Sequence, residues 1–242
     1  MIPARRKPSR RTPRPPHPFD LQHGTDTGAL IPGDNLATGH AHDRHITAYH
    51  GTAPSLFKKL MDRWRDEYAL HSVESTAFLD IGAGKGRAML LATEYPFRRI
   101  VGVELHPALA AAAYENIDHW EQRYPASPRL ALVEDDVMRL RIPAAPCVFF
   151  LFNPFGFVLL DRFLSRLEKA FADRPGECDV IYVNDEQRAV LSEEHPNFRQ
   201  LWRGRVHLSR IDAAADRATI RHDAEGMYVT VGYEDCSLWR LG

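Results

Sequence analysis

The sequence has few cysteines, and their spacing does not suit a cross-linked or zinc-bound scaffold. The three cysteines, Cys147, Cys178 and Cys236, form no CxxC or CxxH pair. An odd number of cysteines without such spacing argues against a disulfide framework and a structural zinc site, and it favours a reducing compartment. We therefore expect a cytoplasmic protein.

The sequence also lacks long apolar runs and an excess of either charge. No stretch of about 18 apolar residues occurs, and the N-terminus lacks the run of roughly 7–15 apolar residues that a secretory signal needs. We expect no membrane span and no export by that route. The 31 Lys and Arg residues nearly balance the 32 Asp and Glu residues, so the net charge is −1. Any affinity for nucleic acid or anionic lipid must therefore be local.

The composition is that of an ordinary globular protein. Of the 242 residues, 44% are hydrophobic and 26% are charged, which is enough to fill a sizeable core. Disorder of the whole chain and fibrous repeats are excluded. We expect one large α/β domain with a tail.

Residues 1–19 form a basic segment rich in proline. Six prolines oppose helix and strand formation, and no acid accompanies the cations, which are Arg5, Arg6, Lys7, Arg10, Arg11 and Arg14. We expect a disordered tail over 1–19. It could be an arm for nucleic acid, the ribosome or an acidic partner, or it could be a solvated leader.

Residues 20–54 show no apolar period and are expected to be loops with at most one short helix. A segment of this length without regular structure is often a lid or a binding loop, and we expect a lid here. It carries four histidines, at His40, His42, His45 and His50. Their spacing matches no compact zinc signature, so we expect no metal, and histidines that face solvent or substrate.

Residues 55–242 are expected to form the folded domain. An apolar stripe predicts a helix over 56–68, and buried strands are predicted over 77–81, 99–104, 130–133, 147–152 and 179–184. Helices are predicted at about 86–95, 107–123 and 158–172, and two further strands over 205–211 and 227–233. This alternation predicts an α/β fold: a mostly parallel seven-stranded sheet with helices on both faces and a C-terminal antiparallel strand pair.

A glycine-rich turn follows the first of these strands. The strand ends in Asp80 and the turn is Gly82-Ala83-Gly84-Lys85-Gly86, a spacing that fits neither a dinucleotide fingerprint nor a P-loop. Glycines let the backbone approach a ligand, and a helix start offers free N–H groups. Because an acid at the strand end repels phosphate and attracts an ammonium group, we expect a nucleotide-like ligand that carries an amine. The alternative is a turn that merely closes a strand–helix junction.

Polar side chains also follow the next three strands. Glu104 ends the second strand, where a carboxylate can accept hydrogen bonds from ribose hydroxyls. Asp135 and Asp136 follow the third, and could instead cap a helix or be solvated. Asn153-Pro154-Phe155 follows the fourth, and could be only a strand exit. All four groups are expected to converge on one crevice at the carboxyl edge of the sheet.

This ordered set of motifs resembles the class I S-adenosylmethionine-dependent methyltransferases over residues 53–185. The resemblance implies a Rossmann-like fold and S-adenosylmethionine as cofactor. By the same resemblance, Asp80 and the loop Gly82, Ala83, Gly84 and Gly86 hold the methionine part, Glu104 holds the ribose, and Asp136 with Val137 holds the adenine. Asn153, Pro154 and Phe155 face the methyl group. D-I-G-A-G-K-G-R and F-N-P-F, with an upstream G-T-D-T-G and Tyr49, resemble bacterial methyltransferases that are loosely related to the non-SET histone-lysine methyltransferases.

The function expected from this resemblance is N-methylation of an amine, in a protein lysine or a small molecule. The amide oxygen of Asn153 and the carbonyl of Pro154 could accept hydrogen bonds from the amine and orient its lone pair. Tyr49, a histidine of the N-terminal loop, and Asp185 or Glu186 are candidate residues on the acceptor side. Two alternatives stay open: a nucleic-acid methyltransferase, favoured by the basic tail and by Asn153-Pro154-Phe155, and a cofactor-binding partner protein without activity. No arrangement of residues supports a hydrolase.

Overall fold

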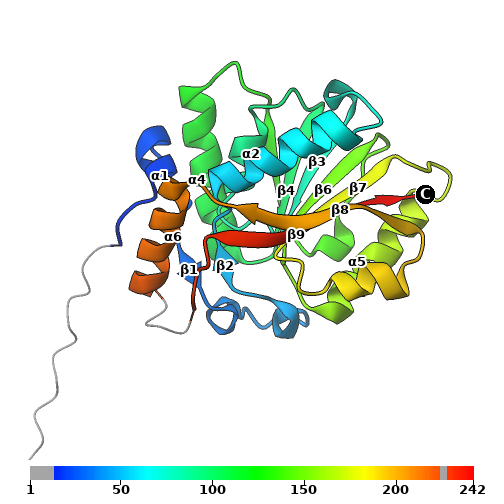
Figure 1. The fold of residues 1–242 in the computed structure, drawn as a ribbon. Helices are drawn as coiled ribbons and strands as arrows, with labels where there is room; N and C mark the ends of the chain where they lie inside the picture. Colours follow the sequence, from blue (N-terminus) through cyan, green and yellow to red (C-terminus); the bar gives the residue numbers. More distant parts are fainter. Residues whose placement is uncertain (1–13, 224–227) are drawn as a thin grey trace, which may run out of the picture.

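A seven-stranded, mostly parallel sheet forms the centre of the molecule, as the sequence predicts (Figure 1). The computed structural model describes residues 14–223 and 228–242. The strand order is β5-β4-β3-β6-β7-β9-β8. The strands are β3 (Ala77–Ile81), β4 (Arg99–Glu104), β5 (Leu130–Glu134), β6 (Cys147–Phe152), β7 (Cys178–Val183), β8 (Phe198–His207) and β9 (Tyr233–Leu241).

The direction of the strands creates a crevice at one edge of the sheet. β3 to β7 are parallel, whereas β9 runs antiparallel to both β7 and β8. β3 pairs with β4 on one side and with β6 on the other, so the strand order reverses beside β3. At such a switch point, open α/β sheets bind ligands beyond the carboxyl ends of the strands.

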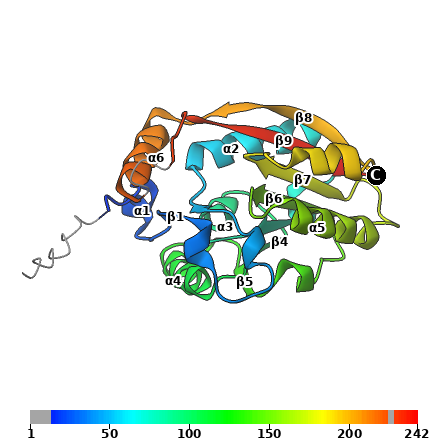
Figure 2. The ribbon, with the colours of Figure 1, turned by 90° about the horizontal axis from the view of Figure 1, so that it is seen from below.

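Helices cover both faces of the sheet (Figure 2). α2 (Pro54–Arg63), α3 (Arg87–Ala92) and α4 (Pro107–Arg123) pack on one face, and α5 (Phe157–Ala170) packs on the other. Every residue of β3 and β7 is buried, because helices cover these strands on both sides. Phe57 of α2 lies 5.8 Å from Phe78 and 5.3 Å from Phe150 between ring centres, which anchors that helix on the sheet. No helix in the described part of the chain is long and apolar enough to cross a membrane.

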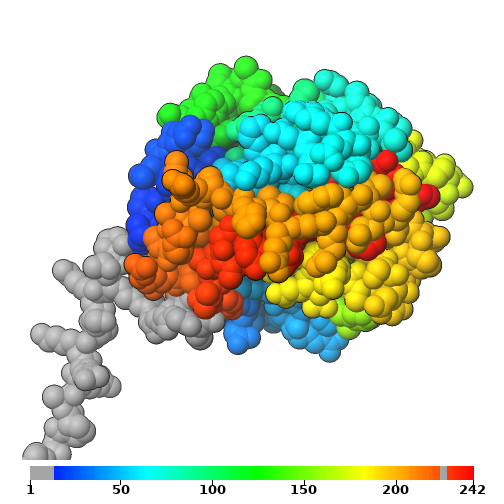
Figure 3. Space-filling model, viewed as in Figure 1, coloured from blue at the N-terminus to red at the C-terminus, as the bar shows by residue number. Residues whose placement is uncertain are grey.

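The C-terminal strand pair exists, but its predicted bounds were wrong. The pair is β8 and β9, whereas we expected strands over 205–211 and 227–233, and Met227 lies outside the described residues. A helix that the sequence analysis missed, α6 (Arg210–Asp223), lies between them and adjoins the beginning of β9 on the surface (Figure 3). Its buried positions include the polar residues Asp212, Asp216 and Thr219, so the helix has no apolar stripe to detect.

The N-terminal segment, residues 14–54, contains more regular structure than we expected from the sequence. The proposed tail boundary at residue 19 was wrong for the described residues 14–19, because His17 and Phe19 are buried and α1 (Pro18–His23) begins there. The rest of the tail, residues 1–13, lies outside the described residues. Within 20–54, β1 (Leu30–Ile31) pairs with β2 (Tyr49–His50).

Arg87 at the start of α3 holds this segment against the domain. Its Nε donates to Thr27 Oγ1 at 2.7 Å, and its Nη1 donates to the carbonyls of Gly51 and Thr52. Its Nη2 lies 3.5 Å from an Asp20 carboxylate oxygen. Arg87 is only 3% exposed, so these contacts are shielded from water.

Candidate functional site

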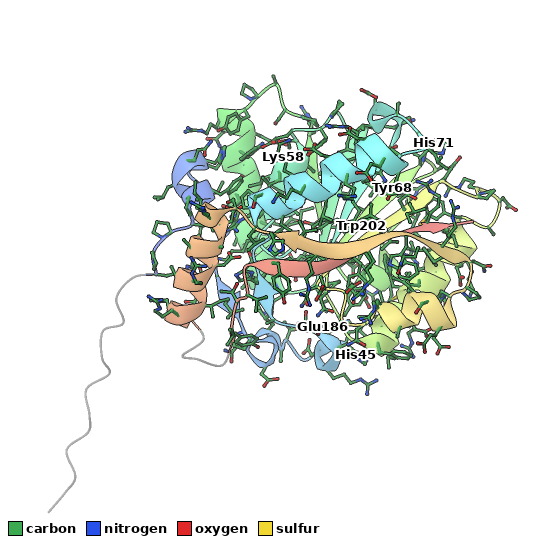
Figure 4. The ribbon with its side chains drawn as sticks, viewed as in Figure 1. His45, Lys58, Tyr68, His71, Glu186 and Trp202 are labelled. Atoms are coloured by element: carbon green, nitrogen blue, oxygen red, sulfur yellow. The ribbon has the colours of Figure 1, made fainter. Side chains whose placement is uncertain are left out.

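A cavity of about 530 Å³ opens at the carboxyl edge of the sheet, beside the switch point. Four parts of the chain line most of it: the N-terminal segment, the carboxyl ends of the parallel strands with the residues that follow them, α6, and the stretch 228–234. Glu186 and His45 lie below β9 in Figure 4, whereas Lys58, Tyr68 and Trp202 lie on or above β8. The cavity brings together all four groups of polar residues that were expected to converge, and its acidic members include Asp80, Glu104, Asp136 and Glu186.

Asp80 is a buried carboxyl group without a hydrogen-bond partner. The side chain is 4% exposed and lines the cavity, and no described residue donates a hydrogen bond to it. Burial, and then the nearby charge of Glu104, raise its pKa to about 8. An ionised Asp80 therefore needs a cation, and an ammonium group that enters the cavity would supply one.

The glycine loop has positive φ angles, which are +73° at Gly82, +55° at Gly84 and +87° at Gly86. Gly82 and Ala83 line the cavity, whereas Gly84 and Gly86 lie behind its wall. A Cβ atom at Gly82 would lie 2.7 Å from the Cβ of Pro154, and one at Gly84 would overlap the ring of Tyr49. These positions therefore need glycine for conformation and for space.

Four N–H groups of the loop already have partners within the protein. Those of Gly82 and Ala83 donate to the carbonyl of Val103, and that of Gly86 donates to the carbonyl of Ala83. The N–H of Gly84 donates to Glu104 Oε2 at 2.7 Å. A ligand can therefore approach the backbone of the loop closely, but these four N–H groups are not available to bind an anion. This agrees with the carboxylate of Asp80 beside the loop, which would repel an anion.

Glu104 links the glycine loop to the end of β4. Besides the bond from Gly84, its Oε1 accepts a hydrogen bond from the N–H of His106 at 2.8 Å. Burial raises its pKa, and these two backbone donors lower it in part. Each carboxylate oxygen keeps a lone pair for a further donor on the cavity side.

Asp136 caps a short 3₁₀ turn and meets the N-terminal segment. Its Oδ1 accepts a hydrogen bond from Met138, as the capping alternative predicted, and its Oδ2 lies 3.1 Å from His42 Nδ1. His40, His42 and Asp136 place one possible ligand atom each within 4.8 Å of one another. His40 Nδ1 accepts the N–H of His42, which leaves His40 Nε2 as its possible ligand atom. Val137, next to Asp136, is buried and lines the cavity.

Asn153 follows β6 with its side chain held from two directions. Its Oδ1 accepts the Tyr182 hydroxyl at 3.2 Å, and its Nδ2 donates to Glu186 at 3.0 Å. Its backbone has a φ of +39°, a conformation that non-glycine residues rarely adopt and that often marks a functional site. The amide group is therefore fixed within the protein, while Pro154 and Phe155 next to it line the cavity.

Tyr49 covers the glycine loop. Its hydroxyl donates to the carbonyl of Thr27 at 2.7 Å, and burial raises its pKa. The phenol is therefore a donor that holds the N-terminal segment, and it is not available as a base near neutral pH. Of the two acids after β7, Glu186 lines the cavity. Asp185 does not line it, and its carboxylate accepts a hydrogen bond from Arg203 Nε at 3.2 Å.

Two residues that were not predicted, Asp216 of α6 and Glu234 of β9, line the same cavity. Neither belongs to a motif; α6 was not predicted at all, and the bounds of β9 were wrong. The pattern that could have indicated Asp216 is its spacing of four residues from Asp212 on one face of a helix, with both acids buried.

Comparisons with known proteins find similar structures and no similar sequence. No protein-family model and no curated protein matches the chain. A MtNAS variant in complex with S-adenosylmethionine is 14% identical with a TM-score of 0.48; the alignment covers 77% of this chain and 62% of that one, so the chain spans less than two thirds of its length. A putative RNA methyltransferase from Pyrococcus horikoshii is 16% identical with a TM-score of 0.49, over 76% of this chain and 82% of that one. An RNA methyltransferase from Salinibacter ruber, in complex with S-adenosyl-L-homocysteine, is 15% identical with a TM-score of 0.45, over 78% and 92%.

Proposed function

We propose that the chain is an S-adenosylmethionine-dependent methyltransferase that methylates an amine. The observation that carries this proposal is the state of Asp80, a carboxylate that is 4% exposed and unpaired, beside a glycine loop at the switch point of the sheet. A cofactor with an ammonium group and a sulfonium group provides the missing positive charge. A dinucleotide would instead bring a pyrophosphate next to Asp80 and Glu104, where both carboxylates would repel it.

The residues of the cavity fit the parts of this cofactor. Asp80 would bind the ammonium group of the methionine part, beside the loop from Gly82 to Gly86. Glu104 would accept hydrogen bonds from the ribose hydroxyls with the lone pairs that its backbone donors leave open. Asp136 and Val137 would contact the adenine by a polar and an apolar surface.

The chemistry at this site would need mainly orientation. When bound, the cofactor supplies an electrophilic methyl group, and the protein has to hold the acceptor nitrogen in line with it. The fixed amide of Asn153 positions the turn from Asn153 to Phe155, and an antiparallel bridge between Ile46 and Phe155 places the N–H of Thr47 opposite the carbonyl of Pro154. A carbonyl oxygen has two lone pairs, so in our proposal this carbonyl accepts an N–H of the amine with the second one.

The nucleic-acid alternative is favoured by the basic N-terminal residues and by Asn153-Pro154-Phe155. Five of the six N-terminal cations lie in residues 1–13, outside the described residues. The sixth, Arg14, lies 3.0 Å from Asp26 and 3.7 Å from Asp223, so it is paired and not free for phosphate. The amine proposal depends instead on Asp80, which is described and unpaired.

Calorimetry with S-adenosylmethionine, S-adenosylhomocysteine and NADH tests the cofactor. We expect both sulfur ligands to bind and NADH not to bind. Asp80→Asn should weaken binding of S-adenosylmethionine at least about tenfold, because one charged acceptor contributes roughly 1.5–3 kcal/mol. Glu134→Gln is the control, since Glu134 ends β5 at the same sheet edge but is exposed and outside the cavity.

Binding of NADH without a response to either sulfur ligand would refute the proposal. Transfer of a radiolabelled methyl group to an acceptor then separates an enzyme from a cofactor-binding partner protein. Binding without transfer to any acceptor in a cell lysate would support the partner protein.

A further inference from the structure

A second pair of acidic side chains lines the same cavity. Asp216 lies on α6 and is 5% exposed, and Glu234 lies at the beginning of β9 and is partly buried. No described residue donates a hydrogen bond to either carboxylate. The group that approaches Asp216 is His50, whose Nε2 lies 3.8 Å from Asp216 Oδ1, beyond hydrogen-bond distance.

The surroundings of this pair do not neutralise it. Burial, followed by the charge of Arg87, lowers the pKa of His50 to about 4, so His50 is neutral at pH 7. The pKa of Asp216 is raised to about 7, because burial outweighs the opposing charge of Arg87; Asp212 adds to the rise and Arg217 opposes it. Burial also raises the pKa of Glu234 to about 7, with contributions from Asp216, Asp235 and Glu186. Two unpaired acids in one cavity favour a cationic ligand.

The pair lies on the side of the sheet where methyl transfer would take place. Phe152 precedes Asn153, and its ring meets His50 edge to face at 6.4 Å, so His50 bridges Phe152 and Asp216. Along β9, Cys236 and Leu238 pack into the same core cluster as Phe150 of β6. Because side chains alternate along a strand, Glu234 lies on the same face of the sheet as Phe152.

An aromatic residue, Tyr228, lines the cavity together with the two acids. Tyr233 lines it too, but it is adjacent to Glu234 on β9, so its ring lies on the other face of the sheet, against Arg205 at 4.7 Å and His207. An aromatic face in a cavity with carboxylates suits the alkyl chain and the charged end of an ammonium group.

Taking the proposed methyltransferase function as given, we propose that Asp216 and Glu234 bind an alkylammonium group and that this amine is the methyl acceptor. The shared chemistry is a flexible primary amine, present in a free alkylamine and in a lysine side chain. Asp216 pairs with the ammonium group. Glu234 takes its proton, because its partly exposed carboxylate can pass that proton on to solvent.

The resulting step is balanced. The ammonium group gives one proton to Glu234, and the nitrogen lone pair then forms a bond to the methyl carbon. The bond between that carbon and the sulfonium sulfur breaks, and the sulfur keeps the electron pair. The product is a secondary ammonium group opposite Asp216, and the proton on Glu234 leaves to solvent.

Two variants and one control test the site. Asp216→Asn and Glu234→Gln keep the shape of each side chain and remove its charge. Asp235→Asn is the matched control, because Asp235 is the next residue on β9, pairs with Arg205 at 3.4 Å and does not line the cavity. The probes are n-butylamine, butan-1-ol as its neutral analogue, and Nα-acetyl-lysine methylamide for the protein source.

We expect the complex with S-adenosylhomocysteine to bind n-butylamine or the lysine probe in calorimetry, and not to bind butan-1-ol. Each cavity variant should weaken amine binding and radiolabelled methyl transfer at least about tenfold, whereas Asp235→Asn should stay within about twofold. Affinity for S-adenosylhomocysteine should stay within about threefold in all variants. Preference for one of the two amine probes identifies the source of the acceptor.

The melting temperature of the ligand-free protein provides a second measurement. A carboxyl group whose pKa is raised on folding binds its proton more tightly in the folded state, so stability falls as pH rises through about 7. At pH 8, Asp216→Asn should therefore raise the melting temperature, whereas a carboxylate needed for the fold would lower it when replaced.

The outcomes separate the two proposals. If the protein binds S-adenosylhomocysteine but neither amine probe, or if both cavity variants keep wild-type amine affinity, the acceptor site is wrong while the cofactor assignment stands. A lower melting temperature of Asp216→Asn at pH 8 would also overturn the acceptor site. If S-adenosylhomocysteine does not bind at all, the methyltransferase function fails, and the acceptor site fails with it.

Discussion

At the scale of single residues, the site is defined by carboxylates that lack protein partners. Asp80, Asp216 and Glu234 each line the cavity without a hydrogen bond from the described residues. Buried polar groups in proteins nearly always have partners, so such acids reduce the stability of the empty protein. The same acids can bind a ligand that carries positive charge. The residues that lower the stability of the empty protein are therefore the ones that bind cofactor and acceptor in our proposal.

A single methyl group added at Gly84 should weaken cofactor binding. Gly84→Ala places its Cβ in the ring of Tyr49 and forces a φ of +55° on an alanine, so Tyr49 and the N-terminal segment must move. We expect affinity for S-adenosylmethionine to fall at least about tenfold, since Gly84 also donates to Glu104.

Gly39→Ala is the matched control for this prediction. Gly39 has a φ of +90°, but a Cβ added there would meet no atom within 4 Å, so the change adds backbone strain of roughly 1–2 kcal/mol without a clash. Calorimetry and thermal unfolding on both variants separate strain from overlap. Equal loss of cofactor affinity in both would contradict the assigned contact between Gly84 and Tyr49.

At the scale of elements, residues 20–54 line the cavity and are attached to the rest of the domain in more than one place. Thr27, Gly51 and Thr52 are bound by the buried guanidinium of Arg87. Residues 45–47 are bound to the turn after β6, where Gly156 donates to the carbonyl of His45 and Thr47 donates to the carbonyl of Asn153. We propose that residues 36–44, where His42 meets Asp136, are the lid. Hydrogen exchange should show little change at residues 25–28 and increased protection at residues 36–44 when S-adenosylhomocysteine binds.

Arg87→Met should release the anchored part of this segment. Removing one partner from a buried ion pair costs roughly 3–5 kcal/mol, and exchange should rise across residues 17–52. Arg98→Met is the control, because Arg98 is exposed and its side chain has no partner among the described residues. Unchanged exchange in Arg87→Met would show that another contact holds the segment.

The elements that sequence could predict are those with apolar periodicity. β3 to β7 and α4 were predicted within one or two residues, because their buried positions are apolar or follow a helical period. α6 was missed because Asp212, Asp216 and Thr219 occupy its buried face, and β8 was misplaced because it is an edge strand with exposed polar residues. Asp80 and Glu104 were found because each ends an apolar strand, whereas Asp216 and Glu234 come together only in the folded chain.

At the scale of the whole molecule, two N-terminal deletions test how much of the N-terminus the domain needs. Deleting residues 1–13 should leave affinity for S-adenosylmethionine within about twofold, because the described residues already supply the cavity wall and the contacts of Arg87. If the deleted cations attract an acidic macromolecule, transfer to that acceptor should fall and should weaken with salt, while transfer to n-butylamine should not.

A deletion of residues 1–17 is the informative comparison. It also removes Arg14, which pairs with Asp26, and the buried His17, whose ring accepts the N–H of Phe19 at the start of α1. Loss of a helix cap costs roughly 0.5–2 kcal/mol, so this deletion should lower the melting temperature where the shorter one does not. Equal melting temperatures for both deletions would contradict the revised boundary.

The packing of α1 on α4 places a tryptophan, Trp120, where its fluorescence reports whether α1 is docked. Trp120 of α4 stacks on Phe19 at 5.9 Å and contacts His23 at 4.9 Å between ring centres. Indole emission depends on exposure to water, and Trp120 is 4% exposed only while α1 covers it. Detachment of the N-terminal segment should therefore redden the fluorescence of Trp120, so the docking of this segment can be followed in real time without a label, in a protein whose other tryptophans are replaced by phenylalanine.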